Sequence, residues 1–325
     1  MWQRKHLLGL AELSADEIRF VLDTADRFED IVTRAVKKTP ALQGRTVVNM
    51  FYEPSTRTNL SFTTAERRLS ADILSFSKSG SSVAKGETLV DTARNIEAMG
   101  VDIMVLRHQA AGAAKLLADN VRCSVVNAGD GEHEHPTQAL LDLYTLRRLL
   151  RENRPAFPRQ FSDLTVGIVG DIAHSRVARS NIWGLTKLGA RVVVVGPATM
   201  MPVGIERLGV TVSSDLDDAI KKCDVLNMLR IQMERQNGFC PFPSLREYSR
   251  LFGVTRERLA RLGKADLPIM HPGPVNRGIE LSPELADSAQ SLILKQVEYG
   301  VAVRMAVLFL VAGVGQSNSQ FTIHN

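Results

Sequence analysis

The chain has 325 residues, of which 44% are apolar, and this is enough to bury a sizeable core arranged as about two domains. Its 40 Lys and Arg residues only slightly exceed its 35 Asp and Glu residues, and 6% of all residues are aromatic, so the composition does not favour a nucleic-acid-binding protein. Three widely spaced cysteines exclude a disulfide scaffold and a zinc knuckle, and no apolar run suits a membrane span or a signal peptide, so we expect a cytoplasmic globular protein.

The first half of the chain alternates between helix and strand patterns. Ser14 and Glu17 have the spacing of a capping box, and the apolar stripe after them predicts a helix that reaches Ile31. The β-branched and aromatic run at 46–52 predicts a strand. The helix expected after this strand carries apolar side chains on one face, at Phe62, Ala65, Leu69 and Ile73. Further buried strands are predicted at 102–106 and 123–127, and further helices at 88–99, 113–120 and 135–153.

The second half repeats this alternation after a break. Two prolines within 153–159 interrupt the pattern and indicate a domain boundary nearby. Beyond it, strands are predicted at 164–170, 191–196, 223–229 and 268–270, and helices at 176–189 and 215–222. A final helix at about 291–310 is expected to pack back on the first domain through an apolar face formed by Leu294, Val297, Val301, Met305 and Leu308.

Nearly continuous apolar strands that are separated by helices are typical of parallel sheets covered on both faces. We therefore predict an α/β fold of two domains, each a parallel β-sheet flanked by helices, joined by long helices. The first domain is expected to comprise residues 1–150 together with the C-terminal helix at 291–325, and the second domain residues 151–290.

The segment at 51–58 joins the first predicted strand to a helix and is rich in hydrogen-bond donors. Ser55, Thr56 and Thr58 offer hydroxyl groups, and Arg57 adds a planar guanidinium group. A helix start also presents backbone N–H groups and the positive end of the helix dipole, which suit a phosphate dianion. Hydroxyl residues at such a position commonly act only as helix caps, but the arginine within the run favours anion binding.

Charged residues follow other predicted strands as well. Arg107 and His108 come at a strand tip, where open α/β sheets bind ligands, although a surface ion pair is the alternative. The loop at 78–87 is small, polar and basic, and on composition alone it is a solvated loop. The segment at 230–235 begins with an arginine and leads into a loop with Gly and Pro residues, which is typical of a substrate cover.

The segment at 131–138 reads Gly-Glu-His-Glu-His-Pro-Thr-Gln and raises the question of a metal site. His133 and His135 are two residues apart in a loop, no cysteine or third histidine is close in the sequence, and Asp130 does not complete a recognisable ligand set. We therefore predict no metal here and interpret His135 as a hydrogen-bond donor at the entry to a helix. The sequence assigns no role to His133 or Glu134.

Two glycine-containing segments of the second half give only a weak functional signal when each is taken alone. Residues 167–171 follow a strand, but their GxxG spacing differs from the GxGxxG dinucleotide fingerprint, which argues against a nucleotide cofactor. Arg176 and Arg179 come next, at a helix start. Residues 271–277 begin with His-Pro-Gly-Pro, which predicts a sharp turn that can direct backbone carbonyl groups inward.

Four arginines at separated places share one feature, because each follows a predicted strand: Arg57, Arg107, Arg176 and Arg230. The sequence shows no acid pair, nucleophilic Ser or Cys constellation, or metal-ligand cluster that competes with them. The pattern indicates a site for one or two multiply charged anionic small molecules. Such a site works through fixed positive charge and orientation of the reactants rather than through covalent catalysis.

The motifs of this chain resemble, in order and in sequence, those of the catalytic chain of the aspartate transcarbamoylase family. They are FYEPSTRT (51–58), SVAKGET (82–88), LRH (106–108), HPTQALLDLYT (135–145), GDIAHSRVARSN (170–181), RIQMER (230–235) and HPGPVNRG (271–278). The resemblance covers nearly the whole chain, and STRT together with HPTQ is specific for the transcarbamoylase superfamily. Arg230-x-Gln232 followed by HPGP is similar to the aspartate branch. Ornithine enzymes typically carry a His-Cys-Leu-Pro turn and an SMG loop, which this sequence does not have.

The resemblance implies a reaction and a set of site residues. In that reaction the amino group of aspartate attacks the carbonyl carbon of carbamoyl phosphate and gives N-carbamoyl-L-aspartate and phosphate, an early committed step of de novo pyrimidine biosynthesis. No metal or organic cofactor is implied. The residues implied to bind carbamoyl phosphate are Ser55, Thr56, Arg57, Thr58, Arg107, His135, Gln138, Pro272 and Gly273. The residues implied to bind aspartate are Ser81, Lys85, Arg176, Arg230 and Gln232.

The resemblance also implies individual roles on the carbamoyl phosphate side. Catalytic roles fall to Arg57, Thr58, Arg107, His135 and Lys85. Arg107 matches the residue that bridges phosphate and carbonyl oxygen, and with Thr58 and His135 it is implied to stabilise the oxyanion of the tetrahedral intermediate. Gln138 matches the residue that holds the carbamoyl amide, together with the backbone carbonyl groups of the turn at 272–273.

On the aspartate side, Arg176 matches the ligand of the α-carboxylate, and Arg230 and Gln232 match the ligands of the β-carboxylate. Ser81 and Lys85 match residues that the family lends from a neighbouring subunit, which implies a homotrimer with sites shared between subunits. A higher assembly with dihydroorotase or regulatory chains is left open. No nucleic-acid or membrane partner is implied.

Two other functions agree less well with these residues. A transcarbamoylase for ornithine or another amine has to accept an ammonium group in the side-chain pocket, where Arg230 would repel it. A non-catalytic scaffold of the same fold is expected to lose some of Arg57, Arg107, His135 and Arg230, and all four are present. The sequence therefore predicts an active enzyme of the aspartate branch.

Overall fold

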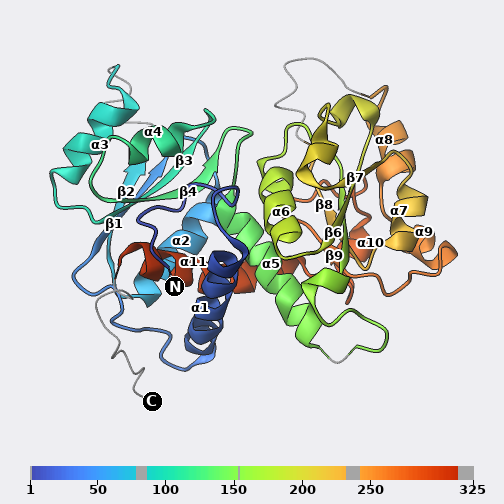
Figure 1. Ribbon diagram of the computed structural model, residues 1–325, viewed down its shortest axis with the longest axis horizontal. Coiled ribbons are helices and arrows are strands. Elements are labelled where there is room, and N and C mark those ends of the chain that lie inside the picture. The colour runs from blue at the N-terminus through green and yellow to red at the C-terminus, as the bar shows by residue number, and fades with distance from the viewer. Residues whose placement is uncertain (1, 78–85, 153, 232–241, 314–325) are drawn as a thin grey trace. The chain divides into compact units, whose positions relative to one another are not determined.

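The computed structural model describes residues 2–77, 86–152, 154–231 and 242–313. The chain forms two compact units, one made of the residues up to Leu141 and from Glu298 onward, the other of Asp142–Val297 (Figure 1). The divisions between the units fall within two helices, α5 (Pro136–Arg151) and α11 (Ile293–Val311). In the described part of the chain, no helix combines the length and the apolar character needed to cross a membrane.

The first unit is built on a four-stranded parallel sheet with the strand order β2-β1-β3-β4. Its strands are β1 (Thr46–Phe51), β2 (Asp72–Ser77), β3 (Ile103–His108) and β4 (Ser124–Asp130). The interior of β1 and all of β4 are buried, as expected for strands that helices cover on both faces. Because the strands are parallel, the segments that follow β1, β3 and β4 all start at one edge of the sheet.

The helices of this unit are α1 (Ala15–Thr33), α2 (Thr56–Arg68), α3 (Leu89–Glu97), α4 (Ala113–Ala118) and the start of α5. Helices α3 and α4 cover one face of the sheet, where Ala93 and Leu117 belong to one apolar cluster with Met50 and Met104 (Figure 1). The predicted capping box before α1 is confirmed by reciprocal hydrogen bonds between its two members. The capping hydrogen bonds fix the start of α1, and the apolar cluster holds α3 and α4 against the sheet.

The helix after β1 is shorter than the sequence predicted. It ends at Arg68, and Ser70 takes a left-handed backbone conformation with a φ of 61°, which cannot continue an α-helix. Ile73 was expected on the buried face of this helix, but it lies in β2, a strand that the sequence pattern missed. The correction places one more parallel strand beside β1.

The second unit is built on a five-stranded parallel sheet with the order β7-β6-β5-β8-β9. Its strands are β5 (Thr165–Val169), β6 (Arg191–Val195), β7 (Thr211–Ser213), β8 (Val225–Met228) and β9 (Ile269–Met270). Its helices include α6 (Arg176–Lys187), α7 (Leu216–Lys222), α8 (Leu245–Phe252), α9 (Arg256–Arg261) and α10 (Pro283–Ala286). Two parallel sheets flanked by helices confirm the predicted α/β fold class. The short edge strand β7 and the helices α8 and α9 were not predicted.

The last long helix, α11, differs from the prediction at its start. Leu294 and Val297 were expected on its buried face, but they are 82% and 50% exposed. Met305 and Leu308, further along the same predicted face, are fully buried. The helix belongs to the first unit from Glu298 onward, so its two ends have different surroundings and one apolar face does not run along its whole length.

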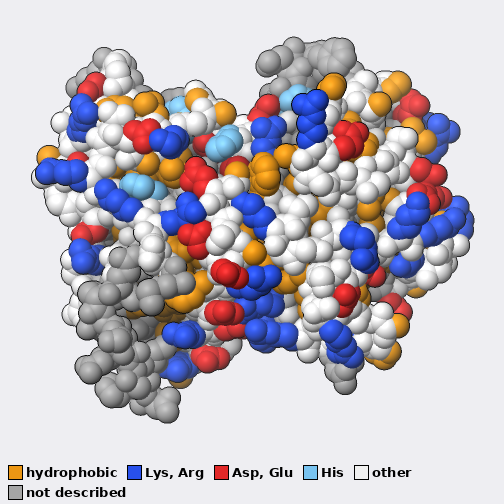
Figure 2. Space-filling view, in the orientation of Figure 1, with side chains coloured by type: hydrophobic (Ala, Val, Ile, Leu, Met, Phe, Trp, Pro, Cys, Tyr) orange, Lys and Arg blue, Asp and Glu red, His pale blue; other side chains and the backbone are white. Residues whose placement is uncertain are grey.

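Charges of both signs lie on the face of the molecule that Figure 2 shows. On the face shown in Figure 2, basic and acidic side chains of the described residues are interspersed over both units. This agrees with the small net charge of +5. The visible face therefore lacks, among its described residues, the broad single-sign surface typical of nucleic-acid binding.

Candidate active site

The junction between β1 and α2 keeps the polar character that the sequence suggested. Ser55 stands at the N-cap position of α2, yet within the described residues its side chain makes no capping hydrogen bond. Its hydroxyl donates instead to Thr58 Oγ1 at 2.9 Å, while Thr56 and Arg57 are exposed. The backbone N–H groups of the first turn therefore receive no cap from Ser55, which favours anion binding over helix capping at this position.

Arg107, at the end of β3, lies beside this helix start. The N–H of Tyr52, just after β1, donates to the Arg107 carbonyl oxygen at 2.9 Å. The guanidinium group donates to the Glu53 carboxylate from Nη2 at 2.6 Å and to the Ala128 carbonyl oxygen from Nη1 at 3.1 Å. Arg107 is buried, so this is not the simple surface ion pair that the sequence left open. Charge-assisted hydrogen bonds in such surroundings are strong, and they hold the guanidinium plane in place.

His135 and Gln138 lie at the start of α5, which follows β4. The His135 carbonyl oxygen accepts hydrogen bonds from the N–H groups of Gln138 at 3.0 Å and Ala139 at 3.2 Å, and so begins the helix. Both side chains are nearly buried. Since β1, β3 and β4 are neighbours in the sheet, their C-terminal ends bring Thr58, Arg107 and His135 to the same edge.

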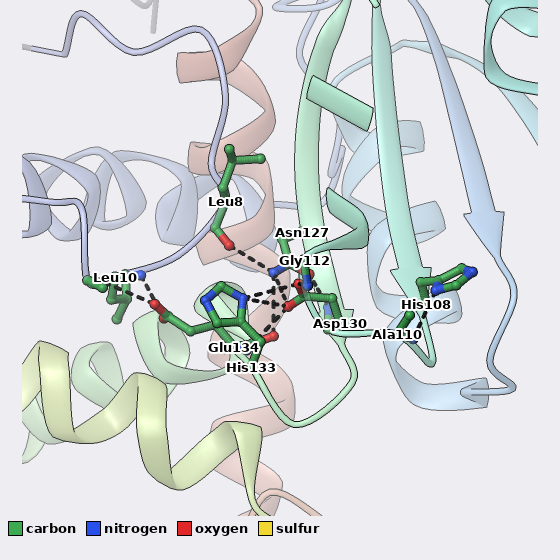
Figure 3. A network of polar contacts seen from close by, with 11 residues as sticks. Leu8, Leu10, His108, Ala110, Gly112, Asn127, Asp130, His133 and Glu134 are labelled. Atoms are coloured by element: carbon green, nitrogen blue, oxygen red, sulfur yellow. Dashed lines mark hydrogen bonds and ion pairs between the residues drawn. The ribbon is translucent and has the colours of Figure 1, made fainter. Parts of the chain in front are cut away.

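Asp130, a buried residue, organises the loop between β4 and α5 (Figure 3). Its carboxylate accepts hydrogen bonds from the Gly112 N–H at 2.8 Å and from Asn127 Nδ2 at 2.7 Å, and it contacts His133 Nδ1 at 3.1 Å. Burial acts to raise the pKa of this carboxyl, but the hydrogen bonds from His133 and Asn127 outweigh burial and hold the pKa below its ordinary range. His133 is thus the partner of a structural carboxylate. Among the residues that the structure describes, no group of His, Cys, Asp and Glu side chains is arranged to hold a metal ion.

In the second unit, Arg176 begins α6 and is almost fully buried. Ser175 caps this helix by accepting a hydrogen bond from a backbone N–H of its first turn at 3.1 Å. The buried Asp171 accepts from the backbone N–H of His174 at 3.1 Å and lies 2.9 Å from its Nδ1. Arg230 follows β8, the neighbour of β5, so the two arginines come from adjacent strand ends. The hydrogen bonds of Asp171 and Ser175 therefore position the loop that leads to Arg176.

The GxxG spacing that follows β5 has a packing explanation. A Cβ atom at Gly167 would lie 2.6 Å from Leu226 Cδ2, and one at Gly170 would lie 3.0 Å from Leu229 Cβ. Both neighbours belong to β8 or to the residue just after it. The glycines therefore allow β5 and β8 to approach closely, and no nucleotide is needed to account for them.

The turn after β9 is held by the buried His271 and Glu280. His271 Nδ1 accepts the Gly273 N–H at 2.8 Å, so in the neutral ring the hydrogen is on Nε2, which donates to Glu280 Oε1 at 3.2 Å. The same oxygen accepts the Asn276 N–H at 2.6 Å. Gly273 has a φ of 68°, a conformation that favours glycine. One carboxylate thus holds both ends of the turn that carries Pro272 and Gly273.

The predicted site residues fall into two groups. The first unit carries, at one edge of its sheet, Ser55, Thr56, Arg57, Thr58, Arg107, His135 and Gln138. The second unit carries, after β5, β8 and β9, Arg176, Arg230, Pro272 and Gly273. The remaining predictions, Ser81, Lys85 and Gln232, lie outside the described residues.

Three carboxylates that support these groups were missed by sequence reasoning: Glu53, Asp171 and Glu280. Glu53 stands inside the FYEPSTRT motif, but its partner is 54 residues away, so no local spacing predicts the pair. Glu280 and His271 are nine residues apart, on opposite sides of a turn whose path only the structure gives. The available signal was the position of each acid within or next to a motif.

Comparison with known proteins gives two family matches. Residues 5–148 match the family described as "Aspartate/ornithine carbamoyltransferase, carbamoyl-P binding domain". Residues 162–311 match "Aspartate/ornithine carbamoyltransferase, Asp/Orn binding domain".

Relatives and solved structures give the same indication. The aspartate carbamoyltransferase catalytic subunit of Halothermothrix orenii is 57% identical, over 96% of both chains. That of Gemmatimonas aurantiaca is 56% identical, over 95% of this chain and 94% of the relative. A crystal structure of aspartate transcarbamoylase from Trypanosoma cruzi in complex with carbamoyl aspartate and phosphate has a TM-score of 0.82 at 29% identity, over 94% of both chains. The catalytic subunit of M. jannaschii aspartate transcarbamoylase has a TM-score of 0.80 at 34% identity, over 97% of this chain and 100% of that one.

Proposed function

The chain belongs to the aspartate/ornithine carbamoyltransferase family, and on this basis we propose that it transfers the carbamoyl group of carbamoyl phosphate to the amino group of L-aspartate. The products are N-carbamoyl-L-aspartate and phosphate. The observation that carries the proposal is the convergence of Thr58, Arg107 and His135 at one sheet edge, beside a helix start that Ser55 leaves uncapped. The relatives named aspartate carbamoyltransferase support the choice of substrate.

The phosphate group of carbamoyl phosphate is expected to bind at the start of α2. There it meets backbone N–H groups, the positive end of the helix dipole, the hydroxyl of Ser55 and the exposed guanidinium of Arg57. Arg107, whose guanidinium plane is held by Glu53, lies at the end of the adjacent strand β3 and is expected to contact both the phosphate and the carbonyl oxygen. Thr58 completes the donors on this side.

The reaction itself requires little proton chemistry from the protein. The amine of aspartate attacks the carbonyl carbon, a C–N bond forms, and negative charge develops on the carbonyl oxygen. Arg107, Thr58 and His135 are expected to stabilise that charge, and fixed donors of this kind lower a barrier substantially. The C–O bond to phosphate then breaks, and the departing phosphate can accept the proton of the amine. Gln138 and the carbonyl groups at 272–273 are expected to hold the carbamoyl amide.

Aspartate is expected to bind through its two carboxylates in the second unit. Arg176 is assigned to the α-carboxylate, and Arg230 with Gln232 to the β-carboxylate. The domain predicted at 151–290 is thus proposed as the aspartate domain, and the domain predicted at 1–150 with 291–325 as the carbamoyl phosphate domain. The family covers ornithine as well as aspartate, but Arg230 would repel the ammonium group of ornithine and attract a carboxylate.

The assembly is proposed from the resemblance of the motifs. Ser81 and Lys85 are expected to reach the site of a neighbouring subunit, so that a homotrimer forms sites shared between subunits. The enzyme is expected to act in the cytoplasm, in pyrimidine biosynthesis. A larger assembly with regulatory or dihydroorotase chains would add to the trimer without altering the proposed site.

The test of the proposed function uses the purified chain alone, without added metal. It is given carbamoyl phosphate with either L-aspartate or L-ornithine, and carbamoyl aspartate and citrulline are measured directly, because carbamoyl phosphate also releases phosphate spontaneously. Formation of carbamoyl aspartate alone is expected. Citrulline would overturn the assignment of Arg230, and no product from either amine would contradict catalysis by the isolated chain.

A further inference from the structure

Residues 7–11 dock on the first unit through backbone hydrogen bonds. The N–H of Leu7 donates to the Val125 carbonyl oxygen at 2.9 Å, and the N–H of Asn127 donates to the Leu7 carbonyl oxygen at 2.9 Å. Asn127 Nδ2 also donates to the Leu8 carbonyl oxygen at 2.8 Å (Figure 3). The start of the chain therefore runs beside β4, the strand that leads into the loop of His135.

Glu134 holds the end of this segment. The residue is 1% exposed, its Oε2 accepts the Leu10 N–H at 2.7 Å, and its Oε1 accepts the Ala11 N–H at 3.1 Å (Figure 3). Gly9 lies against the same carboxylate, because a Cβ atom there would come within 2.4 Å of Glu134 Oε1. A buried carboxylate needs such donors to offset its lost hydration. The N–H groups of Leu10 and Ala11 and the space left at Gly9 thus form the binding site of this carboxylate, called here its seat.

The neighbourhood of Glu134 argues against a chemical role for its carboxylate. Both carboxylate oxygens already accept backbone hydrogen bonds, from the N–H groups of Leu10 and Ala11, as a structural carboxylate does. Its own backbone is held as well, because its N–H donates to Asp130 Oδ1 at 3.2 Å and its carbonyl oxygen accepts the Asp130 N–H at 3.2 Å. The next residue is His135, whose carbonyl oxygen begins α5.

We propose that Glu134 is a positioning residue, which fastens residues 7–11 to the loop at 130–135 and thereby sets the place of His135 and of the first turn of α5. The proposal rests on the proposed function, in which His135 stabilises the oxyanion. Loss of the seat then lets His135 move while the start of α2, on a different strand, keeps its phosphate-binding groups. A small displacement of such a group lowers the rate more than it lowers binding.

Two substitutions disturb this seat from opposite sides. Glu134→Gln keeps the shape but replaces one acceptor oxygen with an NH₂ group that faces a backbone donor. Gly9→Ala leaves the loop intact and pushes on the carboxylate. Each is expected to lower kcat about 10-fold or more, with the Kd for inorganic phosphate within about 2-fold of the parent value. The double variant is expected to lose no more than the worse single variant, because both act through one contact.

Ile18→Val, in the buried face of α1, serves as the control for loss of stability alone, and its kcat should stay at the parent value. A second readout does not depend on activity. Amide hydrogen exchange of residues 130–138 is expected to accelerate about 10-fold in Glu134→Gln and Gly9→Ala, and to stay unchanged in Ile18→Val. Unchanged exchange in the two seat variants, a parent-like kcat, or multiplying losses in the double variant would overturn the proposal. If the parent chain proves inactive, the proposed function fails, and the exchange measurement still decides whether Glu134 fastens the loop.

Discussion

A buried carboxyl group of α2 is expected to make the stability of the first unit depend on pH. Glu66 of α2 is 0% exposed, and its Oε2 accepts a hydrogen bond from Asn49 Nδ2 of β1 at 2.9 Å. Within the described residues, neither Glu66 Oε1 nor Asn49 Oδ1 has a hydrogen-bond partner. A proton on Oε1 turns one of these acceptors into a donor, which favours the neutral acid.

The size of the change in stability follows from the pKa of Glu66. Burial raises the pKa of Glu66 to about 7, and the hydrogen bond from Asn49 offsets only part of this effect. The ordinary value is 4.5, so the folded state binds this proton more tightly than the unfolded chain does. The stabilisation by the bound proton is complete below pH 4.5 and is lost as the pH rises through 7. The gap between the two pKa values corresponds to roughly 3 kcal/mol of unfolding free energy.

The matched control is Glu66→Gln, which keeps the shape and an acceptor for Asn49 but does not ionise. The chain has two tryptophans, so Trp183→Phe leaves Trp2, in the first unit, as the only fluorescent reporter of that kind. Urea unfolding followed through Trp2 between pH 5 and pH 8 gives the stability of each chain.

Relative to Glu66→Gln, the chain with Glu66 is expected to lose most of this roughly 3 kcal/mol between pH 5 and pH 8. Burial lowers the pKa of His6, so His6 makes stability rise with pH, which is opposite to the effect of Glu66. Both chains carry His6, so its contribution cancels in the difference between their stabilities. Parallel stability curves for the two chains would refute the reasoning.

Three further predictions concern the site. Arg57→Ala is expected to lower kcat/KM for carbamoyl phosphate about 1000-fold, because the phosphate loses both a positively charged partner and a group that orients it. Near-normal formation of carbamoyl aspartate would contradict this role of Arg57. Arg57→Ala and Lys85→Ala should each be inactive. When the two variants are mixed, dissociated and reassembled, some activity should return, because one interface of a mixed trimer carries neither defect. No recovery in verified mixed trimers would argue against shared sites. Glu53→Gln should lower kcat about 10-fold by loosening the Arg107 guanidinium, and an unchanged rate would show that Glu53 does not orient it.

Local sequence patterns predicted most of the helices and strands. The capping box before α1, the buried strands and the helices between them are encoded by neighbouring residues, because hydrophobic periodicity and capping act over a few positions. Patterns failed where they were too short or where the surroundings changed. Ile73 continued a helical spacing but lies in β2, since Ser70 turns the chain, and Leu294 is exposed because α11 changes unit after its first turns.

Spacing along the chain shows which residue types follow the strands, and from it comes the prediction that Arg57, Arg107, Arg176 and Arg230 bind anions. The sequence also determined the family, through motifs that span nearly the whole chain. These features are local, so they can be read one segment at a time. The roles of the individual site residues stay predictions until the variants above are measured.

Which of these groups meet depends on the tertiary structure. The sheet order places β1, β3 and β4 side by side, and this order brings Thr58, Arg107 and His135 to one edge. The Glu53 carboxylate that binds Arg107 is 54 residues away from it in the chain, and the Leu10 N–H that donates to the Glu134 carboxylate is 124 residues away. Such hydrogen bonds leave no periodic trace, because their geometry depends on how distant segments pack and not on spacing along the chain. The role proposed for Glu134 likewise depends on the position of residues 7–11 beside β4, which no local spacing encodes.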